Sequence, residues 1–422
     1  MKKALQELFT RISTEEPRVS FRLRFWDGTE AAFGRGAPVF VLTLKTRRAA
    51  RRFLTAGVLG FGEEYTAGNI GVEGNLHELA RLGTTPAVAG YTLSLTTKLG
   101  VLWHYITTLD TKSRARRNIR HHYDLGNDFY RLWLDGSMTY SCAYFKHEND
   151  DLDTAQRQKY DHICRKLQLK AGETLVDIGC GWGGMLIHAA KHYGVKGLGC
   201  TLSQQQYDYA RRRIREEGLE ERITIELRDY RDLTGQYDKF VSIGMFEHVG
   251  RKFIPQFMKK VKQLLKPQGI GLLHTIGKDR HTPGDPWTRR YIFPGSYIPA
   301  LDEIMKGLGR LSLIPTAMEN LRLHYALTLE KWLENFEQHT REVEEMFDER
   351  FVRMWRFFLV GSSAGFRWGD TRLYQVTFTN GLNNQLPLTL EHIYPGAYPE
   401  EKPEPFFAVK PGRLRQRDGE RD

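Results

Sequence analysis

The sequence is poor in cysteine, and its few cysteines do not form a recognisable set. Cys142, Cys164, Cys180 and Cys200 are the four in 422 residues, and they show neither CxxC spacing nor a Cys/His ligand pattern. We therefore predict neither a disulfide framework nor a metal site. A reduced, cytoplasmic protein is the simplest interpretation.

Long apolar runs are also missing. No stretch approaches the roughly 18 to 20 uninterrupted apolar residues that a membrane-spanning helix needs. The first residues, MKKALQELFTRISTEEP, are charged throughout and have no apolar centre, so no signal peptide is expected. With 41% hydrophobic residues, the composition is that of a folded protein, and the length predicts two domains.

Positive charge is in excess, with 62 Lys and Arg against 51 Asp and Glu, a net charge of +11. Such a surface favours an anionic partner, either nucleic acid or an acidic lipid face. The zinc-finger, RNP and KH patterns of nucleic-acid-binding domains are absent, so a lipid surface is expected and nucleic acid is not. A solvated basic face remains the alternative for each basic cluster, which lie at residues 45–52, 112–122 and 410–417.

The pattern along the chain divides it into regions of different kind. Residues 1–90 are predicted to form a small α+β domain, in which a helix precedes alternating stretches at 19–28 and 37–45 and a helical segment at 47–68. Nothing there has catalytic spacing, so we expect a lipid-binding or scaffold unit. The remaining regions are a basic connector (91–120), a catalytic domain (121–400) and a basic polar tail (401–422).

Residues 150–275 alternate short apolar strands with helical segments. This alternation predicts a Rossmann-like α/β fold with a mostly parallel sheet covered on both faces. Ligands of such sheets bind beyond the carboxyl ends of the strands. A single long helix is expected over 325–361, with core packing as its default role and the lining of an acyl tunnel as the alternative.

One glycine-rich turn follows an apolar strand in LVDIGCGWGGML, residues 175–186. Its spacing is not GxGxxG and no GK[ST] follows, which disfavours dinucleotide-binding and P-loop sites. The acidic residue before the glycines resembles the E/DxGxGxG motif of class I S-adenosylmethionine (SAM) methyltransferases. That resemblance implies that Asp177, Gly179 and Gly181 cradle the amino-acid part of SAM. The alternative is a turn without a ligand.

Two later strand ends fit the rest of SAM. The second strand ends in Thr201, where many relatives carry an acid for the ribose; Thr201 and Gln206 are expected to replace it with neutral hydrogen bonds. The third strand ends near Asp229 and Tyr230, which suit the adenine edge.

Several motifs together resemble the cyclopropane-fatty-acyl-phospholipid synthase family, which includes the mycolic acid cyclopropane synthases. The motifs are HHYDLGNDFYRLWLDGSMTYSCAYF (121–145), VDIGCGWGG, FVSIGMFEHVG (240–250) and LLHTIG (272–277), and the match runs from about 115 to 395. The resemblance implies transfer of a methylene carbon from SAM to a cis double bond in an unsaturated acyl chain of a membrane phospholipid, which forms a cyclopropane ring. Residues 1–90 resemble the extra domain of longer, phospholipid-acting members.

This chemistry sets physical demands on the site. An alkene is a weak nucleophile, so the methyl group must be aligned at short distance in a dry cavity. Attack leaves a carbocation, which aromatic rings stabilise, and Tyr123 and Phe246 are candidates. A base must then remove a proton so that the ring closes.

In the family the base is a bound bicarbonate ion, and the resemblance implies its ligands here. Glu247 matches the family glutamate, His274 the histidine and Tyr325 the tyrosine, while Cys142 and Ile276 match positions that contribute mainly backbone contacts. The alternatives are a strand-end ion pair for the glutamate, and core packing for the histidine and the tyrosine.

The short stretch TYSCAYF contains a thiol between aromatic residues. Tyr140, Ser141 and Cys142 match a family segment that closes over SAM and the anion. We predict that Cys142 serves through its backbone and small size, because no His/Asn partner pattern supports a thiolate nucleophile.

The lipid side of the prediction rests on charge and position. Four arginines just before the active-site segment are the candidates for membrane contact: Arg114, Arg116, Arg117 and Arg120. Peripheral association with the inner face of the membrane and a homodimer are the expected assembly. Three alternatives remain open: a relative that installs a methylene or methyl branch, a small-molecule N-methyltransferase, and a noncatalytic lipid-carrier or nucleic-acid-binding protein.

Overall fold

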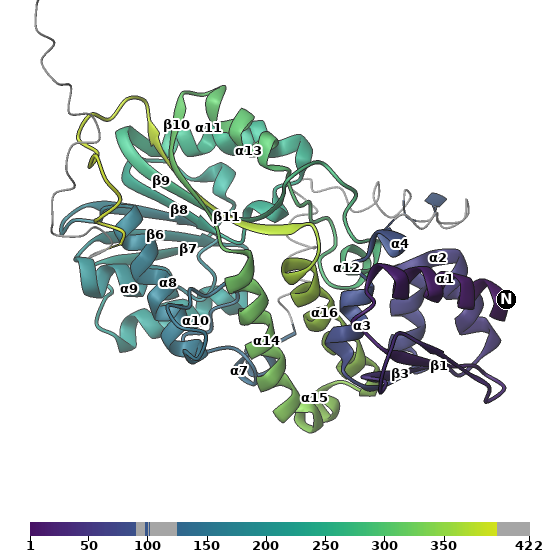
Figure 1. Cartoon of the computed structure of the whole chain (residues 1–422). Helices are drawn as coiled ribbons and strands as arrows, with labels where there is room; N and C mark the ends of the chain where they lie inside the picture. Colours follow the sequence, from purple (N-terminus) through teal and green to yellow (C-terminus); the bar gives the residue numbers. More distant parts are fainter. Residues whose placement is uncertain (90–97, 100, 102–124, 395–422) are drawn as a thin grey trace, which may run out of the picture. The chain divides into compact units, whose positions relative to one another are not determined.

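The computed structural model describes residues 1–89, 98–99, 101 and 125–394 (Figure 1). Contacts group Met1–Asn384 into one unit and Gln385–Asp422 into another, and the described part of the second, 385–394, contains neither helix nor strand. In the described ranges, no helix combines the length and the apolarity needed to cross a membrane. The predicted domain boundaries stay predictions.

The N-terminal residues build a four-stranded sheet with the order β2-β1-β3-β4. Helix α1 buries the predicted apolar stripe of Leu5, Leu8, Phe9 and Ile12. Helix α2 starts after Thr46, whose side chain accepts a hydrogen bond from the Ala49 amide, and it is kinked at a glycine with φ of 53°. The elements are α1 (Lys2–Glu15), β1 (Phe21–Arg24), β2 (Glu30–Phe33), β3 (Phe40–Leu44), α2 (Arg47–Thr66), β4 (Ile70–Gly74), α3 (Leu76–Leu82) and α4 (Pro86–Ala89).

The second sheet has seven strands in the order β10-β11-β9-β8-β5-β6-β7. The five strands β9, β8, β5, β6 and β7 are parallel to one another. At one edge of the sheet, β11 runs antiparallel to β9, and β10 runs antiparallel to β11. The strands are β5 (Thr174–Ile178), β6 (Lys196–Thr201), β7 (Ile223–Leu227), β8 (Tyr237–Ile243), β9 (Leu265–Lys278), β10 (Leu313–Asn320) and β11 (Thr371–Asn380). The predicted Rossmann-like sheet is confirmed.

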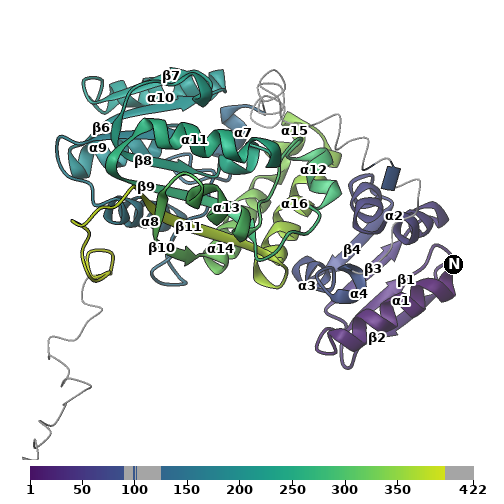
Figure 2. The same ribbon diagram turned by 90° about the horizontal axis from the view of Figure 1, so that it is seen from above.

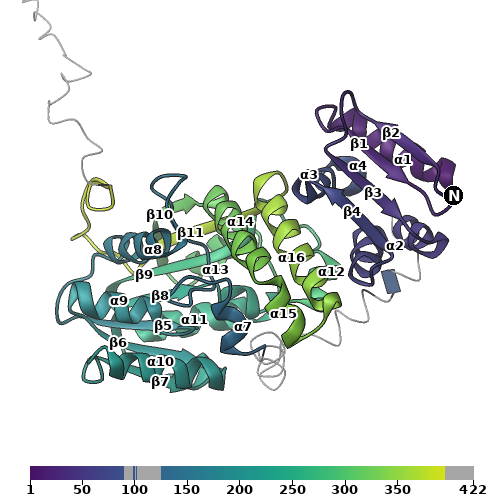
Figure 3. The same ribbon diagram turned by 90° about the horizontal axis from the view of Figure 1, so that it is seen from below.

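Helices cover both faces of this sheet (Figures 2 and 3). Helices α11 and α13 pack together on one face, and α8 and α9 pack together on the other, which also carries α10. Because these five strands are parallel, their carboxyl ends share one edge of the sheet. The helices are α8 (Leu152–Lys166), α9 (Gly184–Tyr193), α10 (Gln204–Glu216), α11 (Ile254–Leu264) and α13 (Leu301–Gly309).

The long helix predicted over 325–361 is wrong in its continuity. The segment forms α14 (Arg322–Gln338), α15 (Thr340–Met346) and α16 (Glu349–Arg367), of which α14 and α16 lie side by side (Figure 1). A new helix starts after Asp348, because its extended backbone and its carboxylate, which accepts from the Phe351 amide, form an N-cap. The remaining elements are α7 (Asn127–Arg131), α12 (Pro286–Tyr291) and the short 3₁₀ turns η1 (Tyr230–Asp232), η2 (Phe246–His248) and η3 (Arg251–Phe253).

Candidate active site

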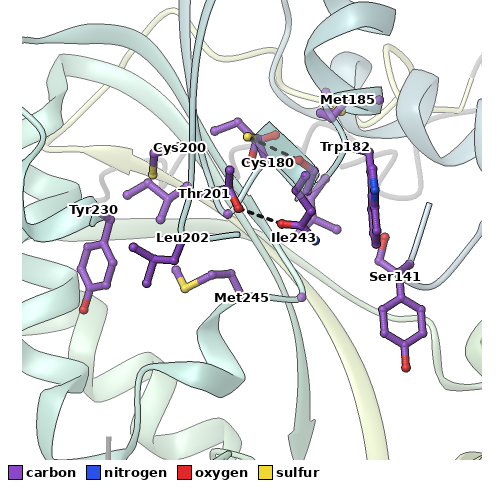
Figure 4. A pocket seen from close by; sticks show the side chains of 18 of the residues that line it. Ser141, Cys180, Trp182, Met185, Cys200, Thr201, Leu202, Tyr230, Ile243 and Met245 are labelled. Carbon is purple, nitrogen blue, oxygen red and sulfur yellow. Dashed lines mark hydrogen bonds between the residues drawn. The ribbon is translucent and has the colours of Figure 1, made fainter. Parts of the chain in front are cut away.

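A cavity lies where the parallel strands β5, β6 and β8 end. In Figure 4, Tyr230 stands on one side of it, and Ser141 and Trp182 stand on the opposite side. All nine residues that the sequence predicts for SAM line this cavity: Tyr140, Ser141, Asp177, Gly179, Gly181, Thr201, Gln206, Asp229 and Tyr230. Separate parts of the chain therefore converge as predicted, although their role in SAM binding stays a prediction.

The glycine turn after β5 takes a shape that side chains resist. Gly179, Gly181 and Gly183 have φ of 83°, 54° and 85°. A Cβ at Gly179 would lie 2.6 Å from the Cβ of Met245, so glycine is required for space as well as for conformation. Helix α9 begins directly after this turn and directs the positive end of its dipole toward the cavity edge.

Asp177 contributes a buried carboxylate to the cavity wall. Its Oδ1 has no hydrogen-bond partner in the part of the chain that the structure describes. Burial raises the pKa of Asp177 to about 7, against the opposing effect of the nearby Lys159 ammonium. A buried, unpartnered carboxylate oxygen fits a cationic ligand group, and SAM carries an ammonium in its amino-acid part.

Ammonium binding at Asp177 predicts a pH dependence. The carboxylate must be ionised, so with a pKa of about 7 in the free protein the SAM affinity should rise about fivefold from pH 6 to pH 7. Above that range the gain levels off, because the α-ammonium of SAM begins to lose its proton near pH 8. Isothermal titration calorimetry across this range measures the effect. Asp177→Asn should bind more weakly at pH 8 and lose the rise; an unchanged pH profile in this variant would remove Asp177 from the site.

Several cavity residues at and after the ends of β6 and β7 have polar side chains that hydrogen-bond to one another or to a neighbouring side chain. The Thr201 hydroxyl donates to Gln206 Oε1 at 2.7 Å, as a neutral pair in place of an acid. Asp229 is held by the Arg231 guanidinium, at 2.8 Å from Nε and 2.6 Å from Nη2. Arg231 also lines the cavity, and the sequence prediction missed it.

Residues 139–145, which we name the strap, cross from the cavity to helix α14. Their main chain is hydrogen-bonded from both sides: Gln156 Nε2 donates to the Ser141 carbonyl at 2.9 Å, and the Ala143 amide donates to Thr328 Oγ1 at 3.0 Å. The buried Lys159 Nζ reaches Ser141 Oγ at 3.0 Å. Gln156 and Lys159 were not predicted, although two polar residues three apart on the buried side of a helix were a detectable signal.

Cys142 is fully buried in the strap. Burial raises the pKa of its thiol far above the usual range, and the Sγ donates to a neighbouring carbonyl, that of Ala143, at 3.1 Å. A neutral, enclosed thiol is a poor nucleophile. The predicted role of Cys142 through its backbone and size stays a prediction.

Replacing Cys142 with alanine should therefore preserve catalysis. We expect kcat within about threefold of the wild type, because no covalent step depends on the thiol. The lost sulfur leaves a small cavity, for which a destabilisation of about 1 kcal/mol is expected. Thermal unfolding and product formation are the measurements. A loss of activity with intact folding and SAM binding would make the thiol essential.

Three of the predicted anion-binding residues, Glu247 of η2 and His274 and Ile276 of β9, lie close to the cavity. Glu247 Oε1 accepts a hydrogen bond from the Ile276 amide, and the His274 carbonyl accepts one at 2.9 Å from the amide of Gly244, which lines the cavity. Glu247 Oε2 and His274 Nε2 are both buried and have no hydrogen-bond partner within the described ranges. An unpartnered acceptor and an unpartnered imidazole nitrogen are the groups that a small oxyanion such as bicarbonate would satisfy.

Burial also controls the charge of these groups. It raises the pKa of Glu247 to about 7, which the Ile276 hydrogen bond only partly offsets. It lowers the pKa of His274 well below the ordinary value, and the Lys159 and Lys166 ammoniums lower it further. At neutral pH the histidine is therefore uncharged, while Glu247 is poised between its two forms.

The remaining predicted residues do not line the cavity or lie outside the described residues. Tyr325, on α14, is half-buried and packs on Phe366 at 4.5 Å between ring centroids and on Trp332 at 6.0 Å. Phe246 is buried in the core under α11, 5.0 Å from the Phe257 ring, and does not line the cavity. Tyr123 and the arginines Arg114, Arg116, Arg117 and Arg120 lie outside the described residues.

Comparison with known proteins places this site in a family. The family model of mycolic acid cyclopropane synthetase matches residues 110–376, more than half of the chain. The chain belongs to this family. A model of a domain of unknown function matches residues 4–85 of this cyclopropane synthetase family member.

Individual relatives agree with the assignment. A probable fatty acid methyltransferase from Pseudomonas putida is 35% identical over 88% of this chain and 96% of its own length. The cyclopropane-fatty-acyl-phospholipid synthase of Escherichia coli K12 is 43% identical over 66% of this chain and 72% of its own.

Solved structures support the fold and the cofactor. The cyclopropane synthase MmaA2 from Mycobacterium tuberculosis has a TM-score of 0.60 and 32% identity, over 63% of this chain and 98% of that one. The mycolic acid cyclopropane synthase CmaA1, solved with S-adenosylhomocysteine, has a TM-score of 0.60 and 30% identity over the same shares. The chain thus has a class I SAM methyltransferase fold, and its family supports SAM-dependent cyclopropane or methyl transfer to lipid acyl chains.

Proposed function

We propose that this protein converts a cis double bond in an acyl chain of a membrane phospholipid into a cyclopropane ring, with SAM as the source of the added carbon. The observation that carries the proposal is the pair of buried, unpartnered atoms Glu247 Oε2 and His274 Nε2 next to the cavity with the methyltransferase glycine turn. A simple methyl transfer to nitrogen or oxygen does not need such a second site, whereas ring closure needs a base beside the methyl donor.

The reaction requires two bond changes on the acyl chain. An alkene carbon bonds to the methyl group as the sulfonium bond breaks, which leaves the neighbouring carbon cationic. Loss of a proton from the added carbon then lets its electron pair close the ring. Bicarbonate, held by Glu247, His274 and Tyr325 with backbone contacts at Cys142 and Ile276, would supply the base for that proton.

The protein's own groups prepare this sequence. The strap, fixed by Gln156 and Thr328, closes the cavity wall and limits water, which would otherwise trap the cation. Tyr140 lines the cavity and packs against two further aromatic rings. Its ring centroid lies 5.3 Å from that of Trp133 and 5.2 Å from that of Trp332. Aromatic faces beside the reacting carbons would stabilise positive charge without reacting with it.

The phospholipid and the membrane contact are inferred from charge and relatives. The chain carries a net charge of +11, which favours an anionic bilayer surface at the inner face of the membrane. The relative from Escherichia coli is named for a phospholipid product. Peripheral binding and a homodimer are parts of this proposal.

The test is incubation of the purified full chain with SAM and vesicles of unsaturated phospholipid, followed by gas chromatography and mass spectrometry of the acyl methyl esters. A product heavier by one CH2 that resists hydrogenation under mild conditions is expected. A heavier product that hydrogenates readily would overturn ring formation, and unmodified lipid despite SAM binding would overturn the lipid assignment.

The first of these failures corresponds to a second candidate function, a methylene- or methyl-branched product. The tuberculostearic acid methyltransferase UfaA1 of Mycobacterium tuberculosis is 36% identical over 88% of this chain and 89% of its own. A methylene branch arises from the same cation by loss of a proton and has the same mass as the ring, so the hydrogenation step of the assay decides between these two products. A saturated methyl branch requires a reductant that adds hydride to the cation, and its product is heavier by two further hydrogens, so the mass identifies it.

A further inference from the structure

Three neighbouring antiparallel strands place three polar side chains in one row. In the register of the sheet, Glu319 of β10 is opposite Gln375 of β11, which is in turn opposite His274 of β9. Helix α8 runs over this face and adds Lys166 and, one turn earlier, His162. Gln375, His274 and Lys166 are each at least nine-tenths buried.

These side chains form a continuous chain of hydrogen bonds that ends at the candidate anion site. His162 Nε2 lies 2.8 Å from Glu319 Oε2, and the same carboxylate oxygen pairs with the Lys166 ammonium. Lys166 Nζ lies 2.7 Å from Gln375 Oε1, and Gln375 Nε2 lies 3.0 Å from His274 Nδ1. His274 Nε2, the far nitrogen of the last member, is buried and has no hydrogen-bond partner among the described residues.

The chemistry of the donors fixes the direction of every bond in this chain. A lysine ammonium only donates, so the amide atom of Gln375 that faces Lys166 must be the oxygen. The amide NH2 of Gln375 then faces His274 and donates to it, so Nδ1 must be the nitrogen without a proton. A neutral imidazole with a bare Nδ1 carries its proton on Nε2.

Charge supports the same state of the histidine. Burial raises the pKa of Glu319, but the His162 hydrogen bond and the Lys166 charge outweigh it and hold that pKa well below the usual range. The carboxylate keeps the lysine paired, and the nearby ammonium opposes a second proton on His274. The titratable groups that act on the imidazole are Lys159, Lys166 and His162 from α8 and Glu319 from β10.

We propose that Gln375 and Lys166, anchored by Glu319, are positioning residues that hold His274 as the neutral imidazole protonated on Nε2, so that it donates a hydrogen bond to the anion beside Glu247. The tautomer follows from the hydrogen-bond chain alone, whereas its use as a donor rests on the proposed function. The consequence is that His274 has no lone pair at the reaction site and cannot be the base.

The decisive variant is Gln375→Glu, which has nearly the same shape but replaces the NH2 donor with a carboxylate oxygen. That oxygen accepts a proton from Nδ1, so the variant should move the proton of His274 away from Nε2. We expect kcat for ring formation to fall on the order of 100-fold, as when one donor to a reacting anion is lost. SAM affinity should stay within about threefold, because Gln375 does not touch the cavity.

Nuclear magnetic resonance reads the tautomer directly in the full chain. Protein labelled with 15N-histidine has 14 histidines, and the spectrum of His274→Gln assigns the resonances of His274. In the wild type, Nε2 should show the protonated, pyrrole-like shift and Nδ1 the bare, pyridine-like shift. In Gln375→Glu, Nδ1 should become protonated.

Two controls separate positioning from simple damage to the sheet. Lys166→Arg keeps a donor-only cation and should retain the tautomer and most of the activity, whereas Lys166→Met should lose both. Thr377→Val removes a different buried polar group of the same strand, the Thr377 hydroxyl that donates to the Ala317 carbonyl at 3.2 Å, and should leave the tautomer and kcat unchanged.

The outcomes distinguish the two levels of the proposal. A wild-type His274 protonated on Nδ1, or on both nitrogens, would overturn the tautomer assignment. The expected shift of the proton in Gln375→Glu without any loss of kcat would overturn the donor role. The expected spectra from a protein that makes no ring product would support the tautomer and refute the proposed function.

Discussion

The Glu247→Gln variant is expected to bind SAM normally but to lose ring formation by about 10³-fold. Glutamine keeps the size of the side chain and an oxygen for the Ile276 amide, so the local fold should survive. It cannot hold or take up a proton, however, and it changes the charge beside the anion. The measurement is the rate of cyclopropane product at saturating SAM, together with the SAM affinity by calorimetry.

A pH profile sharpens this prediction. The pKa of Glu247 is raised to about 7 by burial, so the carboxylate form grows as the pH rises through 7, and kcat of the wild type should rise with it. The variant should lack this limb. Glu64→Gln serves as the matched control, since Glu64 is also buried and hydrogen-bonded, to Asn69 Nδ2 at 2.7 Å, yet belongs to the N-terminal sheet region. Equal activity of Glu247→Gln and the wild type would exclude a proton-handling role.

The second large effect is expected from Gly179→Ala. The new Cβ would approach the Cβ of Met245 to 2.6 Å, so the turn or the Met245 segment must move, and both line the cavity. Displacement of the turn by overpacking costs about 2 kcal/mol, which corresponds to a roughly 30-fold weaker SAM affinity. Calorimetric titration with SAM measures the change.

Gly172→Ala is the control for this experiment. Gly172 has φ of 85°, close to the 83° of Gly179, but a Cβ there would meet nothing within 4 Å. Both variants carry the same backbone strain, and only Gly179→Ala carries the collision. Equal SAM affinities in the two variants would show that the turn tolerates a side chain and that its close packing does not shape the site.

The sequence predicted the residues that line the cavity better than the residues that hold those lining residues in place. The glycine turn and the strand ends were detectable because their residues are adjacent in the chain and recur at the same edge of a parallel sheet. Lys159 escaped prediction because its partner Ser141 lies on another segment and reaches it only in the folded chain. The same holds for Gln375, which reaches His274 only through the antiparallel pairing of β11 with β9. Arg231 was missed although its partner Asp229 is close in the sequence.

The misjudged long helix has a similar cause. Apolar residues continue at helical spacing across 325–361, and periodicity alone does not reveal where a chain reverses. The break occurs where Asp348 adopts an extended backbone and caps the next helix instead of continuing the preceding one. Phe246 illustrates the limit for single residues, since an aromatic ring beside a catalytic motif turned inward to the core and not to the cavity.

The strap has a consequence for how the protein tolerates sequence change. Its position depends on main-chain atoms at Ser141, Ala143 and Phe145, which are bonded to side chains of α8 and α14. Substitutions of the strap's own side chains therefore leave these main-chain hydrogen bonds in place. A single substitution of Gln156, Thr328 or His324 removes one of the hydrogen bonds. Sensitivity to mutation is thus expected at positions of α8 and α14 that anchor the strap and do not themselves line the cavity, and a random-mutagenesis map of activity should find loss-of-function substitutions at Gln156, Thr328 and His324.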